Sequence, residues 1–311
     1  MKSVTRVLAV AVSIGFLIPN PVWAQNQDYR ARNTTERSSA AKQLPQPTSE
    51  LEYKKVGDKS LKLYVFSPEK PKSGKRPAVI FFFGGGWANG TPEQFYPQSA
   101  ELAKRGVVCY CAEYRVSSRD QAKVVDCIAD AQDAVRFLFE HADEQRLDPQ
   151  RIAAAGGSAG GHLAAATALL PYRGSQATPN ANAKPAALIL FNPALVLAAA
   201  DDISVGARDS LRTEQLEKRF GDKPEAVSPY HHLNKSLPPT LILHGKSDTT
   251  VPYATVEGFE KKAKSLGADC TLIGYEDQKH GFFNYGRNQE QYNATVKAMI
   301  EFLTKQKFIE K

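Results

Sequence analysis

The chain has 311 residues, of which 42% are hydrophobic and 23% charged, and a formal net charge of +7. This composition is that of an ordinary globular protein and excludes a collagen-like or largely disordered chain, and four cysteines are too few for a disulfide scaffold of this length. The basic excess is spread along the chain without a basic block interleaved with aromatic residues, so we expect no nucleic acid as a partner.

The N-terminus has the layout of a secretory signal peptide. A short basic segment, residues 1–6, precedes an apolar run at 7–19, which is too short to span a bilayer. Val22 and Ala24 are small residues at positions −3 and −1 of a cleavage site. We therefore expect residues 1–24 to be removed and the protein to be exported to the periplasm or the extracellular space, with no stable membrane span. An uncleaved anchor is the alternative.

Residues 25–50 are polar, contain two prolines and have almost nothing to bury, which predicts a flexible linker. Residues 51–311 are expected to form one folded domain. It opens with two segments of alternating apolar and polar residues, 51–56 and 61–66, separated by a Gly-Asp pair. This pattern is typical of an antiparallel hairpin with one polar face.

Continuous apolar runs follow, which are typical of strands buried on both faces of a sheet. They lie at 78–83, 107–112, 152–155, 186–191, 240–243 and 271–273. Segments with apolar residues three and four positions apart separate several of them, which predicts helices at 121–141, 159–170, 255–266 and 289–303. The alternation predicts an α/β fold with a mostly parallel sheet of about eight strands and helices on both faces.

One segment, residues 195–237, breaks this alternation because it is charged and irregular. A helix is expected within it, around 208–220. The segment lies between two predicted strands, so it is expected to be a short insertion over the carboxyl ends of the strands, where open α/β sheets bind ligands.

The four cysteines leave two interpretations open. Cys109 and Cys111 lie in a predicted strand, Cys127 in a helix and Cys270 in another strand. Export would permit disulfides, and four cysteines allow three complete pairings. Free buried thiols are favoured because none of the four lies in a loop suited to a bridge. No Cys/His cluster indicates a metal site.

The strongest chemical motif is Gly156-Gly157-Ser158-Ala159-Gly160, which lies directly between a predicted strand and a predicted helix. In this context the motif is typical of a nucleophile that projects above the sheet from a sharp turn. The glycines are expected because side chains there would collide with the strand and the helix. The alternative is a glycine-rich helix start that binds phosphate. We interpret Ser158 as the nucleophile.

A serine hydroxyl needs a base to become a nucleophile and an acid to orient that base. His280 lies in a loop before the last predicted helix and follows Ser158 in the chain, as the order serine, acid, histidine requires. Asp248 follows the predicted strand at 240–243 and is expected to be the acid, rather than a solvated turn residue. The other histidines are weaker candidates or have structural interpretations: His141, His162, His231, His232 and His244.

Three consecutive glycines, Gly84 to Gly86, follow the apolar run at 78–83. Such a loop lets backbone N–H groups turn towards an oxyanion. We expect the donors to be the N–H groups of Gly85, Gly86 and Ala159. A merely flexible glycine loop is the alternative.

Together, the segments FFFGGGW, AEYR, GGSAGGH, LILHGKSD and KHGF resemble the α/β-hydrolase superfamily. The resemblance covers roughly residues 50–306 and is nearest to exported esterases of the acetylxylan or feruloyl esterase type, related to hormone-sensitive-lipase-like esterases. It implies the α/β-hydrolase fold and a serine carboxylic-ester hydrolase without metal or organic cofactor. The implied substrate is an ester of a small molecule or of a polysaccharide.

The resemblance also implies site residues by motif match. Ser158, Asp248 and His280 match the family's catalytic triad, Gly85, Gly86 and Ala159 match its oxyanion donors, and Trp87 matches a position near the substrate pocket. One departure is clear: relatives commonly have histidine before the glycines, and this chain has Phe83. We expect Phe83 to be packed core and Arg115 to tether the glycine loop.

Three functions are compatible with this pattern. The leading hypothesis is an exported esterase that removes acetyl or feruloyl-type groups from a polysaccharide or a related ester. A general short-chain carboxylesterase and a serine peptidase or amidase of the same fold are alternatives, because the same triad supports them. A binding protein that has lost catalysis would normally lack a triad member, and none is missing here. The sequence does not indicate an oligomeric state.

Overall fold

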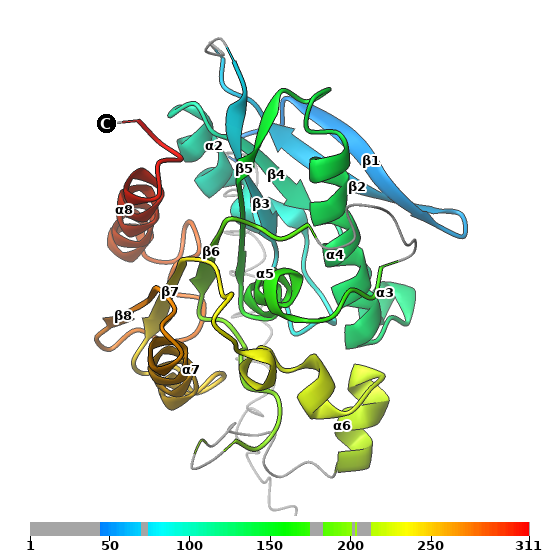
Figure 1. Cartoon of the computed structure of the whole chain (residues 1–311), viewed down its shortest axis with the longest axis vertical. Coiled ribbons are helices and arrows are strands. Elements are labelled where there is room, and N and C mark those ends of the chain that lie inside the picture. Colours follow the sequence, from blue (N-terminus) through cyan, green and yellow to red (C-terminus); the bar gives the residue numbers. More distant parts are fainter. Residues whose placement is uncertain (1–43, 70–73, 175–182, 201–202, 204–212, 311) are drawn as a thin grey trace, which may run out of the picture. The chain divides into compact units, whose positions relative to one another are not determined.

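An eight-stranded sheet flanked by helices forms the body of the protein in the computed structural model (Figure 1), which describes residues 44–69, 74–174, 183–200, 203 and 213–310. The predicted signal peptide and most of the predicted linker, residues 1–43, lie outside the described residues. The first strand begins at Ser49, two residues before the predicted start of the folded domain at residue 51. Within the described residues, no helix combines the length and the apolar character needed to cross a membrane.

The strand order is β1-β2-β4-β3-β5-β6-β7-β8. The first two pairings are antiparallel and the remaining five are parallel, which confirms the predicted fold class. The strands are β1 Ser49–Val56, β2 Lys59–Phe66, β3 Arg76–Phe82, β4 Val108–Ala112, β5 Leu147–Gly157, β6 Ala187–Phe191, β7 Thr240–Gly245 and β8 Cys270–Tyr275.

Helices lie on both faces of this sheet, as Figure 1 shows. The α-helices are α2 Tyr96–Ala103, α3 Ser117–Asp120, α4 Val124–Glu140, α5 Ala159–Leu169, α6 Thr213–Phe220, α7 Tyr253–Ser265 and α8 Gln289–Lys305. Short 3₁₀ helices are η1 Pro92–Phe95, η3 Pro224–Val227 and η4 Pro229–His232.

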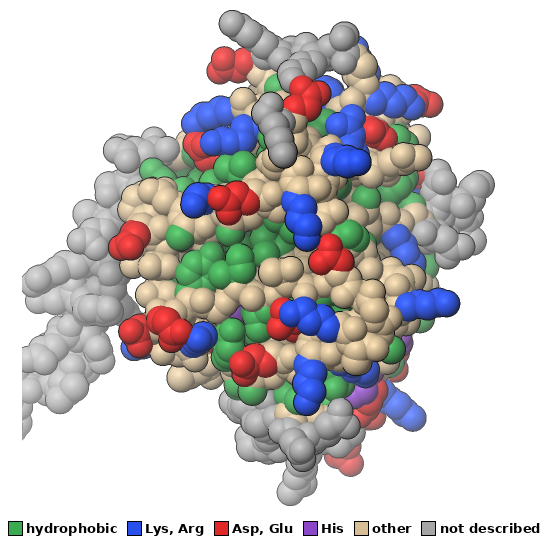
Figure 2. All heavy atoms as spheres, turned by 60° about the vertical axis from the view of Figure 1, so that its left-hand side comes forward, with side chains coloured by type: hydrophobic (Ala, Val, Ile, Leu, Met, Phe, Trp, Pro, Cys, Tyr) green, Lys and Arg blue, Asp and Glu red, His purple; other side chains and the backbone are tan. Residues whose placement is uncertain are grey.

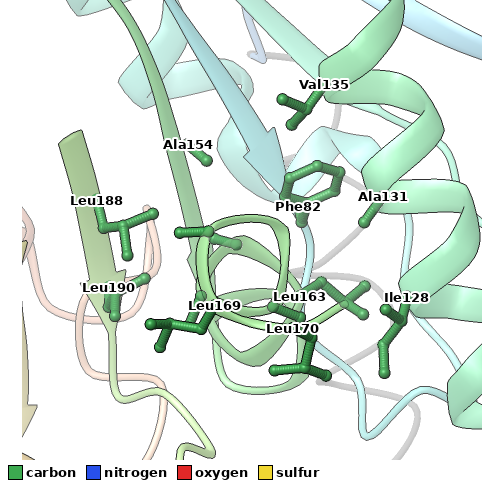
Figure 3. Close-up of a cluster of buried hydrophobic side chains, with 14 of the residues drawn as sticks. Phe82, Ile128, Ala131, Val135, Ala154, Leu163, Leu169, Leu170, Leu188 and Leu190 are labelled. Carbon is green, nitrogen blue, oxygen red and sulfur yellow. The ribbon is translucent and has the colours of Figure 1, made fainter. Parts of the chain in front are cut away.

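The core has two layers because successive side chains of a strand point to opposite faces of the sheet. In β3, Ile80 and Phe82 belong to the core layer that includes residues of α4, α5 and α7, whereas Val79 and Phe81 belong to the layer that includes residues of α2 and α8. Figure 3 shows part of the first layer, with Phe82 beside Ala131 of α4 and with Leu163 of α5 in the same cluster. Burial on both faces explains why the central strands are continuous apolar runs.

The parallel register brings the candidate site together. Phe82 at the end of β3 pairs with Gly156 of β5, and Gly245 at the end of β7 pairs with Tyr275 of β8. The carboxyl ends of β3, β5, β7 and β8 therefore lie at one edge of the sheet, although they are far apart in sequence. The loops that follow these strands carry the predicted site residues.

The segment predicted as an insertion, 195–237, is only partly one. Its first residues, 195–197, are fully buried in the core next to the nucleophile, so they belong to the body of the domain. The described remainder contains α6, η3 and η4, and α6 contributes Phe220 to the core. The helix expected around 208–220 is described from Thr213 onwards, since residues 204–212 lie outside the described part.

All four cysteines are free and buried, as the favoured interpretation predicted. The face in Figure 2 carries basic and acidic side chains next to one another around apolar ones, without a large area of one sign.

Candidate active site

Ser158 lies in the turn between β5 and α5 with φ 54° and ψ −118°. A non-glycine residue rarely adopts positive φ, and such strain persists only where the surroundings enforce it. Here the Ser158 N–H donates to the carbonyl of Phe191 in the neighbouring strand, at 2.9 Å. A Cβ on Gly156 or Gly160 would overlap backbone atoms, including the carbonyl oxygen of Phe82. The sharp turn therefore requires the glycines that the motif supplies.

His280 connects the serine to the predicted acid. Its Nε2 is 2.9 Å from Ser158 Oγ, and its Nδ1 is 2.7 Å from Asp248 Oδ2. A carboxylate only accepts hydrogen bonds, so Nδ1 carries the proton and Nε2 has a free electron pair towards the hydroxyl. The structure thus brings the three predicted residues into one hydrogen-bonded chain.

The carboxylate of Asp248 is fully buried. Its Oδ1 accepts from the backbone N–H groups of Thr250 and Val251, at 2.8 and 2.9 Å. Burial alone would raise the pKa of Asp248. The donors from His244, His280 and Val251 outweigh burial, so the pKa lies well below its usual range. The group is therefore an anion at any pH near neutrality.

The glycine loop, residues 83–90, lies beside the serine. A Cβ on Gly84 would come within 3.3 Å of Ser158 Cβ, and Gly85 and Gly86 have positive φ values of 125° and 64°. Among the described residues, none accepts a hydrogen bond from the backbone N–H of Gly85, Gly86 or Ala159. These predicted donors are therefore available to an oxyanion, because no described group accepts a hydrogen bond from them.

Trp87, the predicted substrate-binding residue, is almost completely enclosed by the protein. It is only 5% exposed, and its indole N–H donates to Nδ1 of His162 at 3.1 Å. Phe220 packs against its ring, and the guanidinium of Arg219 lies 5.6 Å from the ring centroid. These contacts join the glycine loop to α5 and α6.

The other histidines have structural contacts. His162 is buried between Trp87 and the carbonyl of Val227, which its Nε2 contacts at 2.7 Å, as the structural interpretation predicted. His141 contacts the carbonyl of Phe137. Burial lowers the pKa of His231 in η4.

Phe83 is packed core, as predicted. Its ring stacks on Tyr114 with centroids 4.0 Å apart, and the Tyr114 hydroxyl donates to its carbonyl at 2.7 Å. Phe81 lies in the opposite core layer. Arg115 does not tether the glycine loop, because its guanidinium binds the carboxylate of Asp130 in α4. Tyr114 has the tethering role that the sequence analysis gave to Arg115.

Three further polar residues support the site; Gln94 and Asn192 were missed, and His244 was interpreted as structural. Gln94 accepts from the Gly84 N–H at 2.6 Å and donates to Asn284 in the His280 loop. Asn192 accepts from the Gly281 N–H at 2.9 Å. His244, at the end of β7, lies beside Asp248. Asn192 and His244 each stand at the carboxyl end of a buried strand, a position that could have marked them.

The arrangement is suited to acyl transfer: a nucleophile, a base oriented by an anion, and backbone donors beside them. Among the described residues, no group of three or more His, Cys, Asp or Glu side chains is placed to hold a metal ion.

Comparison with known families gives two matches. The BD-FAE family model matches residues 63–263, and the dienelactone hydrolase family model matches residues 220–307.

Curated relatives are esterases. "Probable carboxylic ester hydrolase LipM" of Mycobacterium tuberculosis is 30% identical over 210 residues, which cover 64% of this chain and 47% of that protein. An acetylxylan esterase of Xylanibacter ruminicola is 26% identical over 233 residues, or 72% of this chain and 44% of that protein. The chain spans about half the length of these relatives.

Solved structures cover the domain more fully. Esterase Est2 of Thermogutta terrifontis with bound propionate is 43% identical, with a TM-score of 0.78 over 85% of this chain and 96% of that one. The same esterase phosphonylated by sarin is 42% identical, with a TM-score of 0.81 over 86% and 98% of the two chains.

Proposed function

This chain belongs to the BD-FAE family, and we propose that it is a carboxylic ester hydrolase that works through Ser158, His280 and Asp248. The observation that carries the proposal is the unbroken contact chain from the Ser158 hydroxyl through the imidazole to the buried carboxylate, with distances of 2.9 and 2.7 Å. The esterases among its relatives and structural neighbours support the same reaction class.

In the proposed first half-reaction, His280 Nε2 takes the hydroxyl proton as Ser158 Oγ bonds to the ester carbonyl carbon. The carbonyl oxygen becomes an oxyanion, which the N–H groups of Gly85, Gly86 and Ala159 stabilise. Asp248 stabilises the imidazolium without taking its proton. The oxyanion then collapses, the carbon–oxygen bond to the alcohol breaks, and His280 protonates the leaving alcohol.

In the second half-reaction, water attacks the acyl-enzyme while His280 again accepts a proton. The second oxyanion collapses, the acid leaves, and Ser158 regains its proton. The reaction consumes one water for each ester and needs no further reagent.

The finer proposal is an exported enzyme that removes acetyl or feruloyl-type groups from a polysaccharide. Its support is the signal-peptide pattern of residues 1–24 and the similarity to an acetylxylan esterase. The second candidate is a general short-chain carboxylesterase. It is favoured by the solved neighbours whose bound molecules are propionate and butyrate.

Labelling with a fluorophosphonate tests the reaction class. We expect one equivalent of label on Ser158 of the wild-type protein and none on Ser158→Ala. Peptide mapping by mass spectrometry identifies the labelled residue. Absence of label from a folded wild-type protein, or label on another residue, would overturn the proposal.

A panel of acetyl, butyryl, octanoyl and feruloyl esters, free and on xylan, tests the substrate class. Release of acid from xylan with a higher kcat/KM than from the free esters supports the polysaccharide substrate. Preference for free short esters supports the second candidate. For export, N-terminal sequencing of protein from the culture medium or periplasm is expected to start at Gln25, and recovery only from the cytoplasm contradicts export.

A further inference from the structure

His244 is a buried histidine that the proposed mechanism does not use. It is the penultimate residue of β7, and its side chain is fully buried. Its Nε2 lies 2.9 Å from the carbonyl oxygen of Val251 and 3.3 Å from Oδ2 of Asp248. The second oxygen is the one that accepts from His280 at 2.7 Å. Two histidines therefore meet at one carboxylate oxygen.

The neighbours of His244 determine its protonation. A carbonyl and a carboxylate are both acceptors, so Nε2 must carry the proton. Its Nδ1 is buried, and no described residue lies within hydrogen-bond distance of it. The hydrogen that His244 offers to these two acceptors is therefore the one on Nε2.

This N–H closes the turn that presents the acid. The Val251 carbonyl accepts from His244, while the Val251 N–H donates to Oδ1 of Asp248. The peptide units on both sides of Val251 are thus tied to β7 and to the carboxylate. Two backbone N–H groups of the turn occupy Oδ1 of Asp248, and the His244 N–H lies beside Oδ2. Oδ2 can accept one further hydrogen bond, and His280 donates it.

We propose that His244 is a positioning residue, which holds Asp248 so that its Oδ2 faces the Nδ1–H of His280. The inference rests on the proposed function, because it assigns a role within the same triad. The competing explanation is packing alone, since the His244 ring also contacts the edge of Tyr253 at a centroid distance of 5.8 Å. The titratable groups that face His244 are Asp248, His280 through that carboxylate, and Tyr253 of α7.

Two neutral amides separate positioning from packing. The amide nitrogen of His244→Gln reaches the place of Nε2 and donates there, whereas His244→Asn has the same chemistry but is one carbon too short. We expect His244→Gln to keep kcat within about threefold and His244→Asn to lose about 10–100-fold, as for a small misplacement of a catalytic group, with KM within about twofold in both. Only His244→Asn is expected to shift the acid limb of the kcat/KM profile, by about half a pH unit upwards, because Oδ2 loses a donor.

The rate of fluorophosphonate labelling against pH gives the same comparison without a substrate. Equal kcat values and acid limbs for the two folded variants would show that His244 only fills space and would overturn the inference. If Ser158 of the wild-type protein is not labelled, the proposed function fails, and the two failures are distinguishable.

A measurement on the wild-type protein keeps the inference testable if His244→Asn does not fold. Nitrogen-15 spectra of labelled histidine are expected to show one imidazole with a hydrogen-bonded proton on Nε2, assigned to His244 by its loss in His244→Gln. A His244 signal whose proton lies on Nδ1 instead would overturn the inference.

Discussion

The nucleophile turn, residues 156–161, and the glycine loop, residues 83–90, lie next to each other but are held in place by different means. Backbone atoms enclose the centre of the turn, since a Cβ on Gly160 would overlap the carbonyl oxygens of Phe82 and Phe83. The loop also has close backbone contacts, at Gly85 and Gly90, but side chains add hydrogen bonds to it, from Tyr114, Gln94 and Arg219. At Gly86 the loop is open, because a Cβ there would meet only the Arg219 guanidinium, at 3.7 Å.

This difference indicates which part of the site tolerates substitutions. Backbone atoms of a packed sheet cannot easily move aside, so the turn requires glycine at positions 156 and 160. Side chains can be exchanged one at a time, so the loop can vary while its N–H groups keep their place. Phe83, whose ring stacks on Tyr114, is one such side chain.

The largest expected effect is on the chemical step. Ser158→Ala and His280→Ala should each lower kcat by about 10⁴–10⁶-fold while the protein stays folded, by analogy with other serine triads. Steady-state kinetics and a thermal melt of the same samples measure both. His231→Ala is the control and should retain activity; equal loss in this variant would show that the wrong base has been chosen.

Substitutions of one glycine in the nucleophile turn and one in the glycine loop test this difference directly. In Gly160→Ala the new methyl overlaps two carbonyl oxygens, so the free energy of unfolding should fall by about 3 kcal/mol or more, or the protein should not fold. In Gly86→Ala the methyl has room, and only the positive φ of 64° opposes it, at about 1 kcal/mol. Urea unfolding measures both variants. Equal losses would show that the loop is as rigidly enclosed as the turn.

Phe83→His tests a side-chain support of the loop. The imidazole would replace a ring that is 1% exposed and stacked on Tyr114, and an unpartnered buried polar group costs about 1–3 kcal/mol. We expect a lower Tm with activity falling in parallel. Phe83→Leu, an apolar control, should cost less. A variant that is both as stable as the wild type and faster would contradict this expectation.

The pH dependence separates the two regions as well, because only the triad titrates. The hydrogen bonds that hold the pKa of Asp248 below its usual range keep it ionised, so it adds no step to kcat/KM above about pH 4. His280 must be neutral to accept a proton, so the acid limb should have a slope of one, about tenfold per pH unit. A slope of two would indicate a second group.

The lowered pKa of Asp248 also determines in which direction the stability of the protein changes with pH. The contribution of the ionised Asp248 is fully present above its unfolded pKa of about 3.9 and is lost as the pH falls through the folded pKa. Urea unfolding of wild type and Asp248→Asn between pH 3 and 7 measures it. A difference that grows as the pH falls would contradict this sign.

Arg219 should give the smallest effect. Its guanidinium donates to the Gly86 carbonyl at 3.1 Å and lies over Trp87, but the side chain is exposed. Arg219→Ala should therefore lower the free energy of unfolding by no more than about 1 kcal/mol. Arg219→Lys is the control that keeps the charge. A hundredfold loss of kcat in Arg219→Ala would show that α6 determines the loop geometry.

The sequence alone was sufficient to predict a residue or a strand where the pattern that identifies it lies within one short segment. The GGSAG segment between an apolar run and an alanine-rich helix located Ser158, and the order of the chain located Asp248 and His280. The apolar runs located the central strands, because a strand that is buried on both faces of the sheet has no position for a polar side chain.

Contacts between distant segments could not be predicted. Trp87 is buried by Phe220 and His162, which are more than 70 residues away in the chain, so its burial could not be predicted from its own segment. The tether from Tyr114 to Phe83 is a register effect between separate strands, which explains why it was assigned to the neighbouring Arg115. Gln94 has no local pattern that distinguishes it from a surface residue, whereas Asn192 at least follows a buried strand.

The four free cysteines have a consequence for how the protein can be made. Burial raises the pKa of all four thiols, to about 12 for Cys111 and Cys270, which lowers the thiolate fraction at neutral pH and with it the reactivity of the folded protein towards oxidants. Because no bridge has to form, the native domain makes no demand on the redox state of its compartment. The unfolded chain, in contrast, exposes four reactive thiols, so an oxidising compartment would favour sequences that fold before those thiols can pair.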